Sequence, residues 1–157
     1  MEHIWAPWRI EYIEMDKPAG CILCEKPALN KDTESYILHR GDKNYVMLNA
    51  YPYNPGHMLV VPFRHIAGLD EMTPEERREH IDIVSRCVDV LKKALHPEGF
   101  NTGINLGKPA GAGIADHIHS HIVPRWQGDT NFMTTVGDVR VVPQALADSY
   151  EKLKSGF

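Results

Sequence analysis

Three histidines alternate with other residues between His117 and His121, and this pattern leaves few choices of local structure. They occupy every second position, and Ile122 and Val123 continue the run with apolar side chains. A period of two predicts a β-strand, here over 117–126, because successive strand side chains point to opposite faces. At a rise of ~3.3 Å per residue, neighbouring rings on one face lie about 6.5 Å apart. The three imidazoles can therefore serve one small anionic group or one metal ion.

The residues alone leave three interpretations of this histidine row open. The simplest is a solvent-exposed strand face that carries histidines. The second is a metal site, since a His-x-His pair on a strand can present two nitrogens to zinc. The third is covalent catalysis, in which one neutral imidazole attacks phosphorus while its neighbours orient it and stabilise the developing charge. In each case Pro124 is expected to end the strand ladder, because it has no amide hydrogen to donate.

Composition is that of an ordinary globular chain. With 157 residues, of which 43% are hydrophobic and 24% charged, the sequence predicts one domain over 1–157. A net charge of -4 argues against general nucleic-acid binding, which needs a basic surface. No apolar run is long enough for a membrane span, no signal-peptide core is present, and three cysteines do not describe a secreted disulfide framework. A cytoplasmic location is therefore expected.

The order of the segments predicts an α+β fold with an antiparallel sheet of about five strands. Strands before the histidine strand are expected at 36–40, 45–49, 57–62 and 101–105, and a further one is considered at 139–142. A turn at 41–44 makes the first two strands a hairpin. A C-terminal helix is expected within 143–157. Residues 1–20, with Trp5 and Trp8, are expected to form an aromatic arm against the body or a second subunit.

One long helix is predicted over 74–95 and is expected to pack on the sheet. Thr73 and Glu76 make a capping box, and Pro74 fits the first helical position. The apolar stripe comprises Ile81, Val84, Cys87, Val88, Leu91 and Leu95. Cys87 is therefore expected in the core. His80 and His96 are interpreted as surface or helix-end residues.

A second motif, Cys21-Ile-Leu-Cys24, carries metal or redox chemistry. A Cys-x-x-Cys pair is typical of a zinc knuckle or of a redox dithiol, and both interpretations stay open on the residues alone. A closed structural zinc site needs four ligands, so two more must come from elsewhere in the chain.

Taken together, these motifs resemble the histidine triad (HIT) superfamily. Residues 117–123 match His-φ-His-φ-His-φ-φ, where φ is apolar, except at Ser120, and residues 54–65 resemble the second signature of that family. Trp5-Ala-Pro-Trp8-Arg9 and the tail over 123–133 extend the likeness to the branch of diadenosine tetraphosphate phosphorylase-like and fragile-histidine-triad-like proteins. The resemblance implies a HIT-like fold, a homodimer and structural zinc. The zinc ligands that it implies are Cys21, Cys24, His65 and His117.

The resemblance also implies an enzyme that hydrolyses or transfers nucleotides. Such an enzyme cleaves dinucleoside polyphosphates, or related adenine nucleotides, at the α-phosphate. His119 is the expected nucleophile and would form a nucleotidyl-histidine, and His121 would donate to a nonbridging oxygen. The backbone carbonyl of His117 would fix the tautomer of the nucleophile, which leaves the His117 ring for zinc. A noncatalytic nucleotide-binding module, or a hydrolase whose histidine row binds catalytic zinc, is the alternative.

A further set of residues is expected to bind the nucleotide. The resemblance implies Asn49 for the ribose, Leu48 for the base, and His57 and Asn105 near the phosphates. Gly111 and Gly113 lie in a glycine-rich loop whose backbone can approach a phosphate closely. Asn49 also fits a plain turn, and His57 also fits a buried histidine bonded to the backbone. Lys108 and Arg125 offer cations, and Asp129, Asn131 and Phe132 are candidates for a rim.

The loop before the histidines also departs from the family pattern. Ile114 stands where many members carry Ser or Thr, and Gly113 stands where the phosphorylase-like branch is expected to carry Ser. These departures concern the side chains that hold the leaving group. Whether water or orthophosphate is the acceptor therefore stays open.

Overall fold

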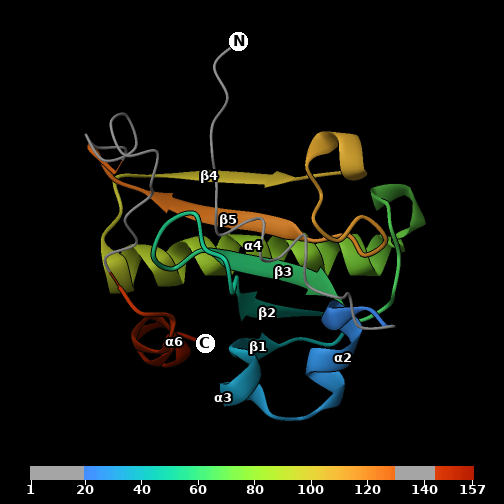
Figure 1. The fold of residues 1–157 in the computed structure, drawn as a ribbon, viewed down its shortest axis with the longest axis horizontal. Coiled ribbons are helices and arrows are strands. Elements are labelled where there is room, and N and C mark those ends of the chain that lie inside the picture. The colour runs from blue at the N-terminus through green and yellow to red at the C-terminus, as the bar shows by residue number, and fades with distance from the viewer. Residues whose placement is uncertain (1–19, 130–143) are drawn as a thin grey trace.

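A computed structural model describes residues 20–129 and 144–157 and contains one antiparallel sheet in the order β1-β2-β3-β5-β4 (Figure 1). The strands are β1 (Ile37–Arg40), β2 (Asn44–Leu48), β3 (Met58–Pro62), β4 (Gly99–Ile104) and β5 (Ser120–Arg125). The helices are α2 (Ile22–Ala28), α3 (Asp32–Ser35), α4 (Pro74–Leu95) and α6 (Leu146–Lys154), with short 3-10 turns η1 (Leu69–Glu71) and η2 (Lys108–Ala110). The predicted α+β fold, with its five-stranded sheet, long helix and C-terminal helix, is confirmed.

Some predictions concern parts of the chain that the structure does not describe. The aromatic arm, the strand at 139–142, and Asn131 and Phe132 lie outside the described residues. Within 20–129 and 144–157, no helix combines the length and apolar character that a membrane span requires.

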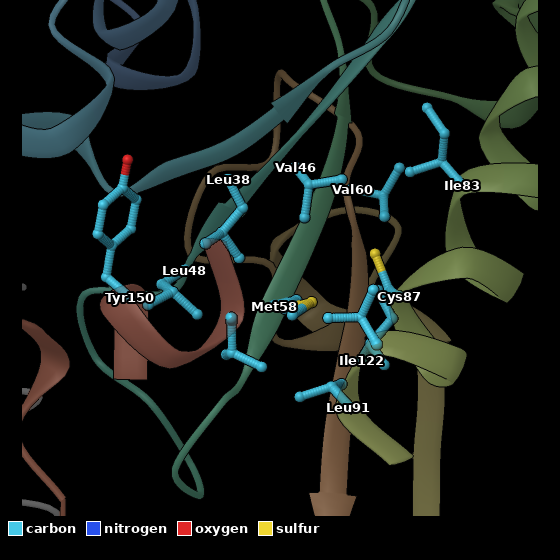
Figure 2. Close-up of a cluster of buried hydrophobic side chains, with 12 residues drawn as sticks. Leu38, Val46, Leu48, Met58, Val60, Ile83, Cys87, Leu91, Ile122 and Tyr150 are labelled. Atoms are coloured by element: carbon cyan, nitrogen blue, oxygen red, sulfur yellow. The ribbon is translucent and has the colours of Figure 1, made fainter. Parts of the chain in front are cut away.

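Helix α4 lies along one face of the sheet and buries the main core (Figure 1). Thr73 and Glu76 form the predicted capping box, with Thr73 Oγ1 accepting from the Glu76 amide at 3.2 Å and Glu76 Oε2 accepting from the Thr73 amide at 2.7 Å. Figure 2 shows side chains from the sheet meeting those of the helix. The labelled core residues include Leu38, Val46, Val60 and Ile122 from the strands and Ile83, Cys87 and Leu91 from the helix.

The buried stripe of α4 is rotated from the predicted one. Ile81 is 65% exposed, whereas Ile83 is buried in the core. His80, interpreted from the sequence as a surface or helix-end residue, is only 2% exposed. The difference arises because His80 finds polar partners inside the protein, and a buried polar ring is tolerated when its nitrogens are hydrogen-bonded.

His80 joins α4 to two strands through a buried hydrogen-bonded chain. Asn44 Nδ2 donates to Glu79 Oε2 at 2.8 Å, so Asn44 Oδ1 faces His80 Nδ1 at 2.8 Å as an acceptor. His80 Nδ1 therefore carries the hydrogen, and its Nε2, 2.7 Å from Ser120 Oγ, accepts from that hydroxyl. This contact explains why Ser120 stands at an otherwise apolar position of the histidine motif.

The histidine strand begins later than the predicted range of 117–126, and its ladder does not end at Pro124 as expected. β5 starts at Ser120, so only His121 of the three histidines lies within the sheet. Pro124 lies inside β5 and pairs with Phe100 of β4. On its other side β5 pairs with β3 only as far as Ile122, so Pro124 has no partner in β3. The missing amide hydrogen of Pro124 therefore costs no ladder bond to β3.

The opposite face of the sheet has its own apolar cluster, beneath α2. It contains Leu23, Ile37, Tyr45, Met47, Leu59 and Val61. The buried Tyr45 hydroxyl donates to the Leu23 carbonyl at 2.6 Å, which fixes α2 against β2. Since α4 occupies the other face, this is the face on which a site beside His121 can open.

Burial of His80 predicts a pH-dependent loss of stability. Burial lowers the pKa of His80 to about 4, from 6.5 for an exposed histidine. The unfolded chain therefore binds a proton that the folded chain does not bind between those values, so the free energy of unfolding falls as the pH drops. From about pH 7 to pH 4, this ring should contribute a loss of about 3 kcal/mol.

The measurement is urea unfolding of the wild type and of His80→Gln across that pH range. The glutamine variant should show a shallower pH dependence, because its amide does not titrate. His96→Asn is the matched control, since His96 is exposed and caps the end of the same helix. If the free energy of unfolding had the same pH dependence in the wild type and in His80→Gln, the lowered pKa of the buried His80 ring would be refuted.

Candidate active site

A cavity of about 150 Å³ opens on the α2 side of the sheet. His119 and His121 line one part of it. Most of the remaining wall is apolar and consists of Ile22, Leu23, Met47, Ala50, Leu59 and Ile114, together with Tyr51 and Tyr53. Asn49 and Lys26 add polar groups, and Gly111 and Gly113 bring backbone to the edge. An apolar slot with a few convergent polar groups is typical of a small-molecule site.

The His119 ring is held by the backbone two residues before it. His119 Nδ1 lies 2.9 Å from the His117 carbonyl oxygen. Because a carbonyl only accepts, Nδ1 carries the hydrogen and Nε2 of the neutral ring keeps its lone pair. Burial lowers the pKa of His119, although the hydrogen bond to the His117 carbonyl opposes that effect.

His121 has the opposite tautomer, set by a chain that also begins at the backbone. The Tyr53 amide donates to His57 Nδ1 at 3.1 Å, so in a neutral His57 ring the hydrogen lies on Nε2. That atom is 2.9 Å from His121 Nδ1, which therefore accepts. The hydrogen of the neutral His121 ring then lies on Nε2. Burial, with a smaller contribution from His119, lowers the pKa of His121 to about 4, so this ring is neutral at pH 7.

Four sulfur and nitrogen atoms converge beside this cavity. Cys21 Sγ lies 3.3 Å from His117 Nδ1, and Cys24 Sγ lies 3.3 Å from His65 Nδ1 and 3.4 Å from His117 Nδ1. All four ligand atoms are within 4.8 Å of one another. His117 Nε2 donates to the Pro62 carbonyl at 2.8 Å, which leaves Nδ1 as the coordinating nitrogen. The structure thus brings together the four residues that the sequence resemblance implies.

The arrangement suits a zinc ion. Zn–S bonds of ~2.3 Å and Zn–N bonds of ~2.0–2.1 Å at tetrahedral angles place sulfur and nitrogen about 3.6 Å apart. The three sulfur-to-nitrogen distances are 3.3 to 3.4 Å, slightly shorter than that value. Two thiolates and two imidazoles are a ligand set that structural zinc uses. The dithiol interpretation is less favoured because each sulfur faces an imidazole.

Comparison with known proteins identifies the family. The model of the HIT domain matches residues 30–128. The chain belongs to the HIT domain family. It is 39% identical over 158 residues to "AP-4-A phosphorylase" of Mycobacterium tuberculosis, covering 95% of this chain and 80% of that protein. The family resemblance predicted from the sequence is therefore confirmed.

Other relatives of this HIT domain agree in family. A bis(5'-nucleosyl)-tetraphosphatase (asymmetrical) of Schizosaccharomyces pombe is 33% identical over 95 residues, covering 60% of this chain and 52% of that protein. Among solved structures, a Zn-bound histidine triad family protein from Mycobacterium smegmatis superposes with a TM-score of 0.69 at 27% identity. That match covers 87% of this chain and 92% of the other.

The HIT domain places the predicted nucleotide residues in three different environments. Asn49, Gly111 and Gly113 line the cavity, and Asn105 lines a second cavity beside it. Leu48 lines neither, because strand alternation turns it into the core under α4 and gives the cavity-facing position to Met47.

Two further predicted residues lie away from the cavity walls. His57 is 1% exposed and sits behind His121, where it bonds to that ring. The His117 ring is fully buried and belongs to the sulfur and nitrogen cluster, while its carbonyl serves His119. The His57 ring therefore contacts His121 from behind the cavity, and the ring and carbonyl of His117 face two different groups.

Sequence reasoning missed the wall that α2 contributes. Ile22, Leu23 and Lys26 line the cavity from this helix. Lys26 is half-buried, burial lowers its pKa, and within the described part of the chain it has no ion-pair partner. The signal that could have found them is the Cys-x-x-Cys motif itself, since Cys21 caps α2 and Cys24 lies in it.

Proposed function

We propose that this HIT domain cleaves dinucleoside polyphosphates, such as diadenosine tetraphosphate, at an α-phosphate through a nucleotidyl-His119 intermediate. The observation that carries the proposal is the pair of opposite tautomers at one cavity. His119 presents a lone pair on Nε2, whereas His121 presents a hydrogen on Nε2. One ring is therefore built to attack and the other to donate. The names of the phosphorylase and tetraphosphatase relatives support this substrate class.

The first step transfers the nucleotidyl group to the protein. The His119 Nε2 lone pair forms a bond to the α-phosphorus, and the bond from phosphorus to the leaving polyphosphate oxygen breaks. His121 Nε2–H donates to a nonbridging oxygen and stabilises its charge. The His117 carbonyl, which accepts from Nδ1–H at 2.9 Å, stabilises the positive charge that the attacking ring gains. In the second step, an oxygen of water or orthophosphate forms a bond to phosphorus, the phosphorus–nitrogen bond breaks, and Nε2 regains its electron pair. When water is the acceptor, the proton that it loses passes to solvent.

The cavity wall suits an adenine nucleotide. Its aliphatic and tyrosine side chains offer flat apolar surface for a base, and Asn49 offers an amide for the ribose hydroxyls. Gly111 has a φ of +90°, a left-handed conformation that favours glycine, so the loop bends where its backbone can approach phosphates. Lys26 adds a cation to the same wall.

The alternatives are less well supported by the geometry. A hydrolase whose whole histidine row binds one catalytic metal is disfavoured, because the His117 ring lies with Cys21 and Cys24 rather than with the rings of His119 and His121. A noncatalytic binding module does not require opposite tautomers on adjacent rings. These two observations favour the covalent mechanism.

We further propose that Cys21, Cys24, His65 and His117 hold a structural zinc ion. Zinc would tie α2, and with it one wall of the cavity, to the segment that carries the catalytic histidines. The related Zn-bound histidine triad protein supports this choice of metal. Two zinc-binding thiolates fit a reducing compartment, so we propose a cytoplasmic location, and the family resemblance leads us to propose a homodimer.

Removal of the nucleophile provides the first test. His119→Ala should lower turnover of diadenosine tetraphosphate by about four orders of magnitude or more, because no other group offers a lone pair at that position. Binding of AMP, measured by calorimetry, should change little. The wild type should also accumulate an acid-labile nucleotidyl adduct at His119 when the reaction is quenched. Turnover of His119→Ala within about tenfold of the wild type would refute the covalent mechanism.

The products identify the acceptor. Diadenosine tetraphosphate supplied with orthophosphate should give ADP and ATP if phosphate accepts the nucleotidyl group, whereas water gives AMP and ATP. Chromatography of reactions with and without orthophosphate separates the two. Persistence of full turnover without orthophosphate would assign the enzyme to the hydrolases.

The zinc proposal predicts a measurable metal content. The purified chain should carry about one zinc per molecule, and Cys24→Ser should lose most of it on dialysis and unfold at a lower temperature. Elemental analysis and thermal unfolding provide the readouts. Cys87→Ala is the control for zinc content, because Cys87 lies in the α4 core away from the cluster. Equal zinc in Cys24→Ser and the wild type would exclude this ligand set.

A further inference from the structure

A second cavity, of about 300 Å³, lies over β4 and β5 on the same face of the sheet. Gly103 is the cross-strand partner of His121, and Asn101 is the partner of Val123. Partners in an antiparallel ladder face the same side of the sheet, so these four positions surround one hollow. Arg125, two residues beyond Val123, lines it as well.

The two cavities meet at Tyr53 and His121, which line both. Their chemistry differs sharply. The first is walled mainly by aliphatic side chains, whereas the second presents the amides of Asn101 and Asn105 and the guanidinium of Arg125. A substrate group placed against His121 can therefore extend an apolar part into the first cavity and a polar part into the second.

The second cavity contains hydrogen-bond donors that could bind a ligand. Arg125 Nη1 lies 2.6 Å from Asn101 Oδ1, and because a guanidinium only donates, Asn101 Oδ1 is the acceptor. Among residues 20–129 and 144–157, the Asn101 NH₂ group has no hydrogen-bond partner, so it can donate to a ligand. Within the described residues, Arg125 also donates from Nε and Nη2 to Asp129, at 2.5 and 2.8 Å. Two of its five N–H bonds remain without a partner there.

This donor set fits an oxyanion that binds and leaves in every turnover. The amide and the guanidinium both donate, as phosphate oxygens require. The carboxylate of Asp129 neutralises the positive charge of Arg125, so hydrogen bonds rather than a net positive charge would hold an anion in this cavity. Release of a phosphate group is therefore not opposed by an unpaired cation.

We infer that the second cavity is the subsite for the orthophosphate that accepts the nucleotidyl group, an inference that rests on the proposed function. An ionised oxygen of hydrogen phosphate forms a bond to the α-phosphorus, and the bond between that phosphorus and His119 Nε2 breaks. The electron pair returns to Nε2, and the product is a nucleoside diphosphate. No base is needed, because the attacking oxygen carries no proton. Asn101 and Arg125 hold the other phosphate oxygens.

Gly103 keeps this subsite open and provides a handle for testing it. A Cβ built at Gly103 has no atom within 4 Å, so a larger side chain meets nothing in the described residues and projects into the hollow. Gly99 is likewise free of neighbours within 4 Å and lies on the same face of the same strand, but it does not line the cavity. Gly103→Val and Gly99→Val therefore form a matched pair.

The experiment measures exchange of radiolabelled orthophosphate into ADP, which reports only the half-reaction in which phosphate is leaving group or acceptor. In the wild type, exchange should saturate with orthophosphate. Asn101→Ala should raise the orthophosphate KM about tenfold, the cost of one hydrogen bond to a charged group, with little change in the saturating rate. Gly103→Val should raise that KM at least as much, and Gly99→Val should raise it less, because its valine would lie beside Arg125 but outside the cavity.

The outcomes separate the subsite from the proposed function. A wild type that forms no nucleotidyl adduct from diadenosine tetraphosphate would refute the proposed function itself. Adduct formation without any exchange of orthophosphate would leave that function standing and overturn the acceptor subsite. Exchange with the same orthophosphate KM in the wild type, Asn101→Ala and Gly103→Val would also overturn it.

Discussion

The hydrogen bond between His119 Nδ1–H and the His117 carbonyl is the interaction on which the proposed chemistry depends. It joins a side chain to the backbone of a residue whose own ring points elsewhere, at Cys21 and Cys24. One residue thus serves two sites through two different groups. Because the His117 ring is also held by the Pro62 carbonyl at 2.8 Å, the backbone at this position has little freedom to turn. The cysteine cluster and the attacking nitrogen are therefore fixed by the same segment of chain.

Support for this segment comes from both faces of the sheet. On the α4 face, Ser120 donates to His80, which is anchored in turn by Asn44, so the residue between the two pocket-facing histidines is tied to the long helix. On the other face, His57 bonds to His121. A strand held by buried polar bonds on both sides cannot slip by one residue without losing several partners at once. The positions of the His119 and His121 rings thus depend on contacts across both faces of the sheet.

Sequence patterns predicted the fold well where one signal dominated. The capping box at Thr73 located the start of α4, and strand periodicity located the sheet. α2 and α3 were missed, because helices of 7 and 4 residues show too few turns for a periodic stripe. Leu48 was assigned to the wrong face, since a strand buried on both faces has no polar alternation to orient it. His80 was misjudged because its partners come from distant parts of the chain.

The two pocket-facing histidines show why residue type alone does not give a role. The His119 ring is buried and the His121 ring is partly buried, and desolvation lowers the pKa of each, so both are neutral imidazoles at pH 7. What separates them is the backbone group at the end of each hydrogen-bonded chain. A carbonyl, which can only accept, holds His119, whereas the Tyr53 amide, which can only donate, sets His121 through His57. Backbone groups cannot exchange these functions, so neither ring can adopt the other tautomer without breaking its chain. A spacing of two residues predicts that the rings are neighbours, but only the fold decides which one attacks.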